Sequence, residues 1–442
     1  MIEQRLKDFI NIELKEFSNY DNTRSIPSII DGFKDSQRKC VYGLIKHGSS
    51  ELKVSQLSEY VSMATDYLHG STSLCGTIVG LAQNYPGSNN VNLFEPIGQF
   101  GNILNSSAAA ARYIYTKPTD YLKKLIRSED DDILTYRMEE GKSLEPTYYL
   151  PIIPLWVLNG TRGIGTGHSV NIQPRSLKDI KSIIKNIVLG KPLPKIDPLP
   201  HYNGWKGKVE RSETQGQYIL TGKYEIVNTT TIKITELPIG YDIDKYKSIL
   251  IKLMDDGTVK DFDNNSTESG FEFIITVPRE VTRRTESEII TLFKLQTKVT
   301  ENITLWDTDG ALTKYDSIID ALEEVVLFRL DKYTIRKESM LNKMRDSLIM
   351  MNYKMKFILF WIHDMKEPQK KSKNEILEIL NVYANIPNEV GEKMLELRIS
   401  SLTMELVERL EKEIEDTKIK ISDLEKMEIG ELYCNELDEI KT

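Results

Sequence analysis

One stretch of the 442-residue sequence carries more chemical information than any other, and it reads Ser106-Ser-Ala-Ala-Ala-Ala-Arg-Tyr-Ile-Tyr-Thr116. Its four consecutive alanines leave little side-chain bulk, so another surface can approach the backbone closely. A tyrosine oxygen such as that of Tyr113 can attack phosphorus and store the bond energy as a phosphotyrosine ester, and the guanidinium of Arg112 suits the charge that develops on phosphate oxygens. Taken alone, an arginine–tyrosine pair is better explained as an aromatic side chain in a strand or a core.

Charge is unevenly distributed along the chain. The net charge is −8, but residues 24–127 hold 11 Lys and Arg against 7 Asp and Glu. Residues 401–442 hold 6 Lys and Arg against 13 Asp and Glu. A mildly basic module is therefore joined to an acidic end, and only the first is expected to bind phosphates.

Several classes of site are not expected. The 3 cysteines and 5 histidines are scattered, without a Cys-x-x-Cys pair, which argues against a metal centre or a disulfide framework and favours a reduced, cytoplasmic compartment. The sequence holds no Walker A loop, no nucleophile elbow and no apolar run long enough to cross a bilayer, so no membrane partner is expected. Asp130-Asp131-Asp132 has the chemistry to bind a metal ion, but a solvated charged turn is the favoured interpretation.

The last third of the chain is predicted to be helical, because apolar residues recur there at spacings of three and four. The first heptad pattern comprises Leu341, Met344, Leu348, Met351, Met355, Ile358 and Ile362. The second comprises Val407, Leu410, Ile414, Ile421 and Leu424. These patterns predict an antiparallel helical hairpin with a globular tip, and two amphipathic helices of an ordinary bundle are the alternative.

The middle of the chain has an α+β pattern. Strand-like stretches occupy residues 216–221, 231–235 and 271–276, and helix-like stretches at 177–189 and 286–294 flank them. A Pro/Gly-rich segment precedes this region, and its many glycines indicate a backbone held close to another surface or several turns with positive φ.

Further blocks of sequence give the Arg112–Tyr113 motif a specific meaning. Ala-Ala-Ala-Arg112-Tyr113-Ile-Tyr-Thr116 resembles the active-site strand of type IIA DNA topoisomerases, and is most similar to the eukaryotic branch. Other blocks resemble the same family in order and approximate spacing, and these are residues 26–43, 69–74, 77–90, 158–167, 293–300 and 315–319. The resemblance covers nearly the whole chain. One departure is that position 68 is Leu, where relatives often carry a second His before His69.

The resemblance implies roles for individual residues. Tyr113 would attack the scissile phosphate and hold the 5′ end of the DNA, while Arg112 would stabilise the transition state. Arg38 and His69 match family residues beside the scissile phosphate. Ile164 matches an isoleucine that wedges between base pairs and bends the duplex. The weaker matches, as contacts to the DNA backbone, are Lys34, Lys39, Asn84 and Gln99.

The resemblance also implies an α+β multidomain architecture with a winged-helix DNA-binding module, a mixed α/β tower domain and an antiparallel coiled coil carrying a globular dimer gate. The expected parts are an N-terminal arm (1–24), the winged-helix cleavage domain (25–150), the tower (151–315), a coiled-coil helix (316–364), the gate (365–400), and a returning helix with an acidic tail (401–442).

The activity implied is a transient double-strand break in DNA, made by two symmetry-related Tyr113 residues, followed by strand passage and religation. Two copies would pair through the C-terminal gate. The family's acidic Toprim site for Mg²⁺ has no convincing counterpart in this sequence, and no ATPase motif is present, so we expect Mg²⁺ and ATP to be held by a partner subunit. Without a DNA-wrapping domain, relaxation and decatenation are expected rather than supercoiling. The rivals are a nicking or recombining tyrosine enzyme and a non-enzymatic architectural protein.

Overall fold

The computed structural model describes residues 6–365, 368–398 and 402–441, which form two compact units. One unit contains Met1–Leu330 with Tyr433–Thr442, and the other contains Asp331–Leu432. The first mixes helices with small antiparallel sheets, and the second is built from helices in its described part. The α+β architecture predicted from the sequence is therefore confirmed. Within the described ranges, no helix has the length and apolar character needed to cross a membrane.

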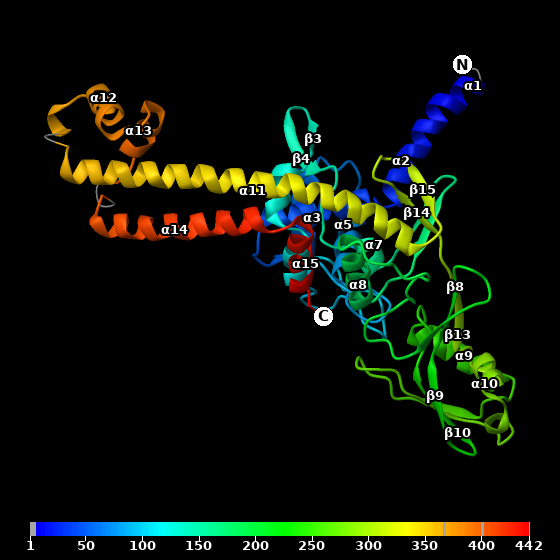
Figure 1. The fold of residues 1–442 in the computed structure, drawn as a ribbon. Coiled ribbons are helices and arrows are strands. Elements are labelled where there is room, and N and C mark those ends of the chain that lie inside the picture. The colour runs from blue at the N-terminus through cyan, green and yellow to red at the C-terminus, as the bar shows by residue number, and fades with distance from the viewer. Residues whose placement is uncertain (1–5, 366–367, 399–401, 442) are drawn as a thin grey trace. The chain divides into compact units, whose positions relative to one another are not determined.

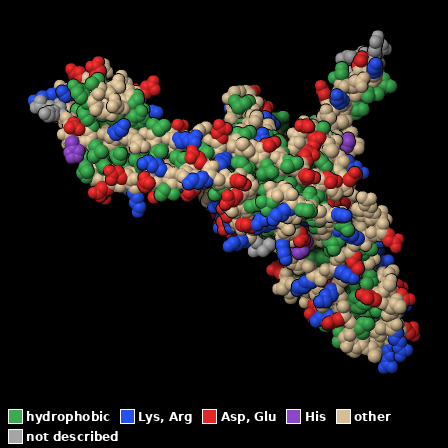
Figure 2. All heavy atoms as spheres, viewed as in Figure 1, with side chains coloured by type: hydrophobic (Ala, Val, Ile, Leu, Met, Phe, Trp, Pro, Cys, Tyr) green, Lys and Arg blue, Asp and Glu red, His purple; other side chains and the backbone are tan. Residues whose placement is uncertain are grey.

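An arm begins the first unit. It consists of α1 (Leu6–Phe9), the π-helical segment η1 (Ile10–Leu14) and α2 (Lys15–Ser25). In Figure 1 the arm projects from the body of this unit, and Figure 2 shows hydrophobic side chains gathered along it. Its exposed apolar side chains are Leu6, Phe9, Ile10, Ile12, Leu14, Phe17 and Tyr20. Only the last turns of α2 are packed, and Asn22 there is buried.

Three helices form the centre of the region that follows the arm. They are α3 (Asp35–His47), α4 (Val54–Ala64) and α5 (Ser71–Ala82), and they pack against one another. Each helix turns apolar residues spaced three or four apart toward the shared interior, as Val54, Leu57 and Val61 of α4 illustrate. Gly43 of α3 permits the close approach, because a methyl group there would meet the Val61 side chain.

The other elements before residue 160 are short. They are β1 (Leu52–Lys53), β2 (Tyr115–Thr116), α6 (Asp120–Leu125), the 3-10 helix η2 (Ser128–Ile133), β3 (Tyr136–Glu139), β4 (Lys142–Pro146) and α7 (Leu155–Leu158). β1 pairs with β2, and β3 pairs with β4, both antiparallel. The β1–β2 pairing places residues near position 53, directly before α4, beside those near position 115.

A tower of two antiparallel sheets follows. The four-stranded sheet has the order β11-β12-β10-β9, and the three-stranded sheet has the order β13-β8-β7. The strands are β7 (Lys208–Arg211), β8 (Gln217–Thr221), β9 (Lys223–Asn228), β10 (Thr231–Glu236), β11 (Asp261–Asn264), β12 (Phe273–Thr276) and β13 (Gln296–Thr300). The helical elements of this region are α8 (Leu177–Val188), α9 (Ile243–Asp255), η3 (Val281–Arg283) and α10 (Glu286–Leu292). The strands predicted near 216–221, 231–235 and 271–276 and both predicted helices are confirmed.

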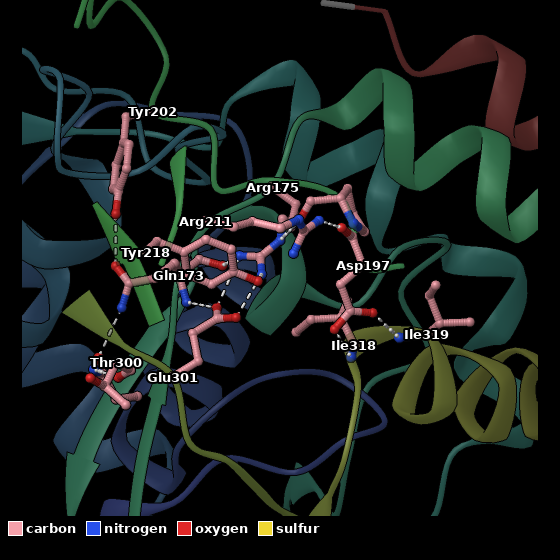
Figure 3. A network of polar contacts seen from close by, with 12 residues as sticks. Gln173, Arg175, Asp197, Tyr202, Arg211, Tyr218, Thr300, Glu301, Ile318 and Ile319 are labelled. Carbon is pink, nitrogen blue, oxygen red and sulfur yellow. Dashed lines mark hydrogen bonds and ion pairs between the residues drawn. The ribbon is translucent and has the colours of Figure 1, made fainter. Parts of the chain in front are cut away.

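The tower is tied to its neighbours by a buried ion pair, shown in Figure 3. Arg175 and Glu301 are joined by two charge-assisted hydrogen bonds, 2.7 Å (Nη2–Oε2) and 3.0 Å (Nη1–Oε1), with side chains 0% and 4% exposed. The Gln173 backbone N–H donates to the same carboxylate at 2.7 Å. Nearby, Asp197 accepts hydrogen bonds from the backbone N–H groups of Ile318 and Ile319, at the start of the long helix α11 (Ile318–His363). This network joins three segments that lie far apart in the sequence.

The second unit is an antiparallel pair of long helices with a small helical tip. The pair is formed by α11 and α14 (Met404–Lys426), which run side by side in Figure 1. Arg345 of α11 pairs with Glu425 of α14 at one end, and Phe357 shares a buried cluster with Val407 at the other. The tip contains η4 (Pro368–Lys370), α12 (Lys373–Ala384) and α13 (Asn388–Leu395). The predicted helical hairpin is confirmed. All five residues of the second heptad pattern are buried, whereas Ile362 of the first is exposed.

The chain ends in α15 (Ile429–Glu439), whose last residues belong to the first unit and not to the hairpin. Tyr433 is buried there, and its hydroxyl donates to the Ile152 carbonyl at 2.8 Å. Lys185 of α8 binds Asp438 at 2.7 Å, and Arg127 pairs with Glu439. The sequence suggested an acidic tail at this position. In the structure, this segment is instead the helix α15, which basic residues hold against the first unit.

Candidate functional site

Tyr113 is presented on a tight turn at the surface of the first unit. Its side chain is 68% exposed, and its backbone N–H donates to the Ala110 carbonyl at 2.9 Å. The next residue, Ile114, is buried and anchors the turn, since its carbonyl accepts a hydrogen bond from the Val54 N–H at 3.0 Å. A buried anchor directly after an exposed tyrosine leaves the phenol oxygen accessible while it limits the movement of the backbone that carries it.

The position of Tyr113 corrects one part of the sequence interpretation. The resemblance to the family's active-site strand led us to expect a strand at this motif, but residues 111–113 form a turn and β2 begins at Tyr115. Tyr115 is half-buried, and its backbone N–H donates to the Ile97 carbonyl at 2.9 Å. The ring of Tyr115 faces Lys53, whose ammonium lies 5.9 Å from the ring centroid. The two tyrosines therefore lie in different environments, and only Tyr113 is exposed.

Arg112 is exposed and lies over the ring of Tyr113. The centre of its guanidinium is 5.0 Å from the ring centroid, within the range of a cation–π contact. This contact holds a permanent positive charge beside the phenol without engaging the phenol oxygen. A phosphate that approaches Tyr113 therefore meets a phenol oxygen and a hydrogen-bond donor together.

Several other potential nucleophiles of the first unit are buried, whereas Tyr113 is exposed. Burial raises the pKa of the Cys40 thiol far above its ordinary value, and it likewise raises the pKa values of the phenols of Tyr149 and Tyr246. Such groups resist forming the anion that attacks phosphorus. A solvent-accessible phenol beside an exposed arginine is consequently the better candidate in this region.

Ile164 lies on a second exposed feature, the hairpin of β5 (Thr161–Ile164) and β6 (Ser169–Ile172). Its side chain is 76% exposed although it is purely apolar. Arg162, two residues earlier, is also exposed, whereas Gly163 between them is buried. Alternation along the strand therefore puts Arg162 and Ile164 on one outer face. Arg162 was missed in the sequence interpretation, although the same alternation would have indicated it.

Arg38 and Lys39 are not surface residues in this structure. Arg38 is 9% exposed, and its guanidinium binds Asp31 through Nε (2.8 Å) and Nη2 (3.0 Å). Although burial opposes the charged form, the Asp31 carboxylate raises the pKa of Arg38 above its ordinary value. Lys39 is 3% exposed, and its ammonium pairs with Glu145. Both charges are thus paired with carboxylates inside the fold.

His69 lies just before α5 and is held by two aromatic side chains. Tyr20 of the arm places its hydroxyl 2.8 Å from Nε2 of His69. Tyr67 packs edge-on against the imidazole, with ring centroids 5.3 Å apart. Tyr20 is not part of any motif that the sequence interpretation used, so only the fold brings it to His69.

The weaker matches differ in accessibility. Lys34 is partly buried, its ammonium donates to the Arg162 carbonyl at 2.6 Å, and burial lowers its pKa. Gln99 is exposed, and its side-chain oxygen accepts from the Gly101 N–H at 2.9 Å, which shapes the loop before the alanine run. Asn84 is exposed after the end of α5. Lys34 thus supports the hairpin, while Gln99 and Asn84 can meet a ligand at the surface.

The carboxylates of the described residues do not assemble into a metal centre. No group of three or more His, Cys, Asp or Glu side chains with metal-binding geometry occurs among them. Asp130 was interpreted as part of a solvated turn, but it is buried and binds Arg329 through two hydrogen bonds of 2.7 and 2.8 Å. Asp131 and Asp132 are exposed, as expected. The part of the chain that the structure describes therefore does not fit a Mg²⁺ site of its own.

The first unit thus presents an exposed tyrosine–arginine turn and an exposed isoleucine on a hairpin, and the second unit contains an antiparallel pair of long helices. The family model that describes the A-type subunit of DNA gyrase/topoisomerase IV matches residues 24–438. The chain belongs to this family.

Similar proteins include DNA topoisomerase 2-alpha of Rattus norvegicus, 39% identical over 387 residues, or 84% of this chain and 25% of that protein. DNA topoisomerase 2 of Arabidopsis thaliana is 34% identical over 484 aligned residues, which cover 98% of this chain and 33% of that protein. The crystal structure of the DNA-binding, cleavage and re-ligation domain of Plasmodium falciparum topoisomerase II superposes with a TM-score of 0.90 at 34% identity, covering 98% of this chain and 63% of that one. The chain spans a quarter to a third of the length of these curated relatives.

Proposed function

We propose that this chain cleaves and rejoins double-stranded DNA as part of an ATP-dependent type IIA topoisomerase, with Tyr113 as the nucleophile. The observation that carries the proposal is the exposed phenol of Tyr113 with the Arg112 guanidinium over its ring, on a turn anchored by buried Ile114. Membership of the family of gyrase and topoisomerase IV A-type subunits supports the same reaction.

The proposed reaction is a reversible exchange of phosphate esters. The Tyr113 oxygen attacks the scissile phosphorus, a bond forms between them, and the bond from phosphorus to the 3′ oxygen of the DNA breaks. The phenol loses its proton and the 3′ oxygen gains one. Arg112 stabilises the charge on the non-bridging oxygens. In religation the 3′ hydroxyl attacks the phosphotyrosine and releases Tyr113, so no energy is consumed in the chemical steps.

The remaining predicted site residues act around this centre. Ile164 inserts between base pairs and bends the duplex, with Arg162 beside it as an additional phosphate contact. His69 contacts the DNA near the break, and Asn84 and Gln99 contact the backbone. Arg38 acts indirectly, because its pairing with Asp31 shapes the loop before α3. Lys39 is left out of the DNA contacts because it is buried with Glu145.

We further propose that Mg²⁺ and ATP are bound by a separate Toprim/ATPase subunit, and that two copies of this chain pair through the helical tip (residues 365–400) as a dimer gate. For Mg²⁺, the proposal is consistent with the described residues, which hold no group of three or more His, Cys, Asp or Glu side chains able to bind a metal ion. For ATP and for a separate subunit, it rests on the resemblance given above and on the sequence, which has no ATPase motif. In an enzyme divided in this way, this chain would resemble the medium subunit of a T-even bacteriophage topoisomerase. Mg²⁺ would supply charge neutralisation at the phosphate when bound.

The proposal is tested by covalent attachment to DNA. Two copies of this chain with the proposed Toprim/ATPase subunit form the complete assembly, which is incubated with supercoiled plasmid and Mg²⁺. The reaction is stopped with detergent, the protein is digested with a protease, and the DNA-linked peptide is identified by mass spectrometry. Tyr113→Phe removes only the attacking oxygen and should abolish attachment with the fold intact. Tyr115→Phe is the matched control and should retain it. Attachment through Tyr115, or cleavage without any protein–DNA link, would reject Tyr113 as the nucleophile.

The same experiment distinguishes the proposed enzyme from the chief alternative, a non-enzymatic DNA-bending protein. That function is favoured only by the exposed wedge of Ile164 and needs no reactive phenol. Such a protein would bind and bend duplex equally well with Tyr113 or Phe at this position, and it would yield no DNA-linked peptide under any condition.

A further inference from the structure

Three consecutive residues at the end of the arm contact two separate parts of the proposed DNA-binding surface. The Tyr20 hydroxyl lies 2.8 Å from Nε2 of His69. Asp21 accepts a hydrogen bond from the Thr166 hydroxyl at 2.7 Å, and the Asn22 side-chain amide donates to the Thr166 carbonyl at 3.1 Å. Thr166 belongs to the loop between β5 and β6, directly after the wedge residue. One helix therefore touches the segment that carries His69 and the segment that carries Ile164.

The contact to His69 determines what this histidine can offer to DNA. A neutral imidazole has one donor and one acceptor nitrogen, and the partner of one nitrogen sets the role of the other. The contact fits either direction, and when the Tyr20 hydroxyl donates to Nε2 the imidazole proton lies on Nδ1. Because Tyr67 also packs edge-on against the ring, the imidazole is held from two sides. In that tautomer Nδ1 is the ring donor that remains for another partner, such as a phosphate.

The contact to the hairpin is equally close. A methyl group added at Gly163 would lie 1.9 Å from the Ser25 carbonyl oxygen, and one at Gly165 would lie 2.2 Å from the Asn22 side-chain oxygen. The glycines on both sides of Ile164 are therefore required by the end of α2, which lies against the hairpin backbone. Since the backbone on either side of it is held in this way, Ile164 projects outward while its strand cannot shift without moving α2.

From these contacts we propose that α2 is a positioning element for the DNA-cleavage site, in which Tyr20 orients His69 while Asp21 and Asn22 hold the hairpin of Ile164. The inference rests on the proposed cleavage function. None of these three residues is expected to touch the reacting atoms. Tyr20 is thus a positioning residue, and its effect should pass entirely through the imidazole of His69.

The first test needs neither DNA nor catalysis. The full chain has 5 histidines, so selective ¹⁵N labelling gives few ring signals, and His69→Ala identifies the one that belongs to position 69. Tyr20→Phe should move the ring nitrogen shifts of His69 toward a mixture of tautomers. Tyr67→Phe is the control, because its hydroxyl bonds Ser73 at 3.4 Å and not the imidazole. Identical His69 nitrogen shifts in the wild type and in Tyr20→Phe would overturn the proposal.

The second test is a double-mutant cycle on the rate of covalent attachment by the complete assembly. Loss of one hydrogen bond predicts that Tyr20→Phe slows attachment about fivefold. In the His69→Ala background the same substitution should change the rate less than twofold, because its target is gone. An equal slowing in both backgrounds would show that Tyr20 only stabilises the arm, which refutes its role through His69. Attachment that survives Tyr113→Phe would instead refute the proposed function. The nitrogen spectra would still test the hydrogen bond between Tyr20 and His69.

Discussion

Replacement of Ile164 by alanine gives the sharpest test of how the surface works on DNA. The side chain is 76% exposed in the free protein, so Ile164→Ala should change the stability of the fold by no more than about 0.5 kcal/mol. In a bent duplex the same side chain would be buried between base pairs. The substitution therefore separates a role in DNA distortion from a role in the protein core.

The free energy that the substitution removes from DNA bending follows from the exposed fraction of the Ile164 side chain. Alanine lacks three carbon groups of isoleucine, worth about 0.8 kcal/mol each on burial, and three quarters of that surface is available to be buried, which gives about 1.8 kcal/mol. That free energy corresponds to roughly a 20-fold smaller population of bent over unbent complexes. Overall affinity at low salt should change much less, because phosphate contacts dominate it.

The assay is energy transfer between dyes on the two ends of a duplex that contains one preferred cleavage site. Wild-type protein should bring the ends closer, and Ile164→Ala should lower the ratio of bent to unbent complexes about 20-fold at equal occupancy. Ile226→Ala is the matched control, since Ile226 is also an exposed isoleucine on a strand, β9 of the tower. Normal bending by Ile164→Ala, or equal loss in the control, would refute the wedge.

Three further outcomes follow from the structure. Glu301→Gln leaves the buried charge of Arg175 without its carboxylate and should destabilise the first unit by about 3–5 kcal/mol. Hydrogen exchange in β8 and β13 would measure this loss, and unchanged protection there would contradict the role of the pair. Arg162→Ala should lower the salt dependence of DNA binding by about one phosphate contact, and an unchanged slope would remove Arg162 from the interface. The hydrogen bond from Lys185 lowers the pKa of Asp438, so this carboxylate stabilises the docking of α15 above its ordinary pKa of 3.8, and the contribution is lost as the pH falls through the lowered value. Lys185→Met should therefore raise the pKa of Asp438 in an NMR titration, and an unmoved titration would show that the ion pair is not formed.

The periodic parts of the fold could be predicted from the sequence. The heptad pattern around Val407 and the strand-like stretch near residue 231 each occupy one element, and an element buries the face that its own periodicity makes apolar. The long helices and the tower strands were identified for this reason. The docking of α15 was not, because an acidic amphipathic segment has the same pattern whether it is solvated or bound to Lys185 and Arg127.

The conformation around Tyr113 shows where local patterns are insufficient. The resemblance to the family's active-site strand suggested that Tyr113 lies on a strand, yet the Ala110 carbonyl closes a turn that ends at Tyr113. That turn is held by Val54 and Ser55 at the start of α4, about sixty residues earlier in the chain, whose backbone N–H groups bond the carbonyls of Ile114 and Ala111. A pattern within eleven residues contains no information on such partners.

The amino-acid sequence alone established which chemical groups the protein carries, namely a tyrosine after an arginine, an isoleucine between glycines, and two heptad helices. Which of these groups are accessible depended on tertiary packing. Tyr113 and Ile164 lie at the surface, whereas Lys39, in an equally suggestive motif, is buried with Glu145, more than a hundred residues away. The physical reason is that the burial of a charge depends on its partner, and partners such as Glu145 for Lys39 or Tyr20 for His69 meet only when distant segments pack together.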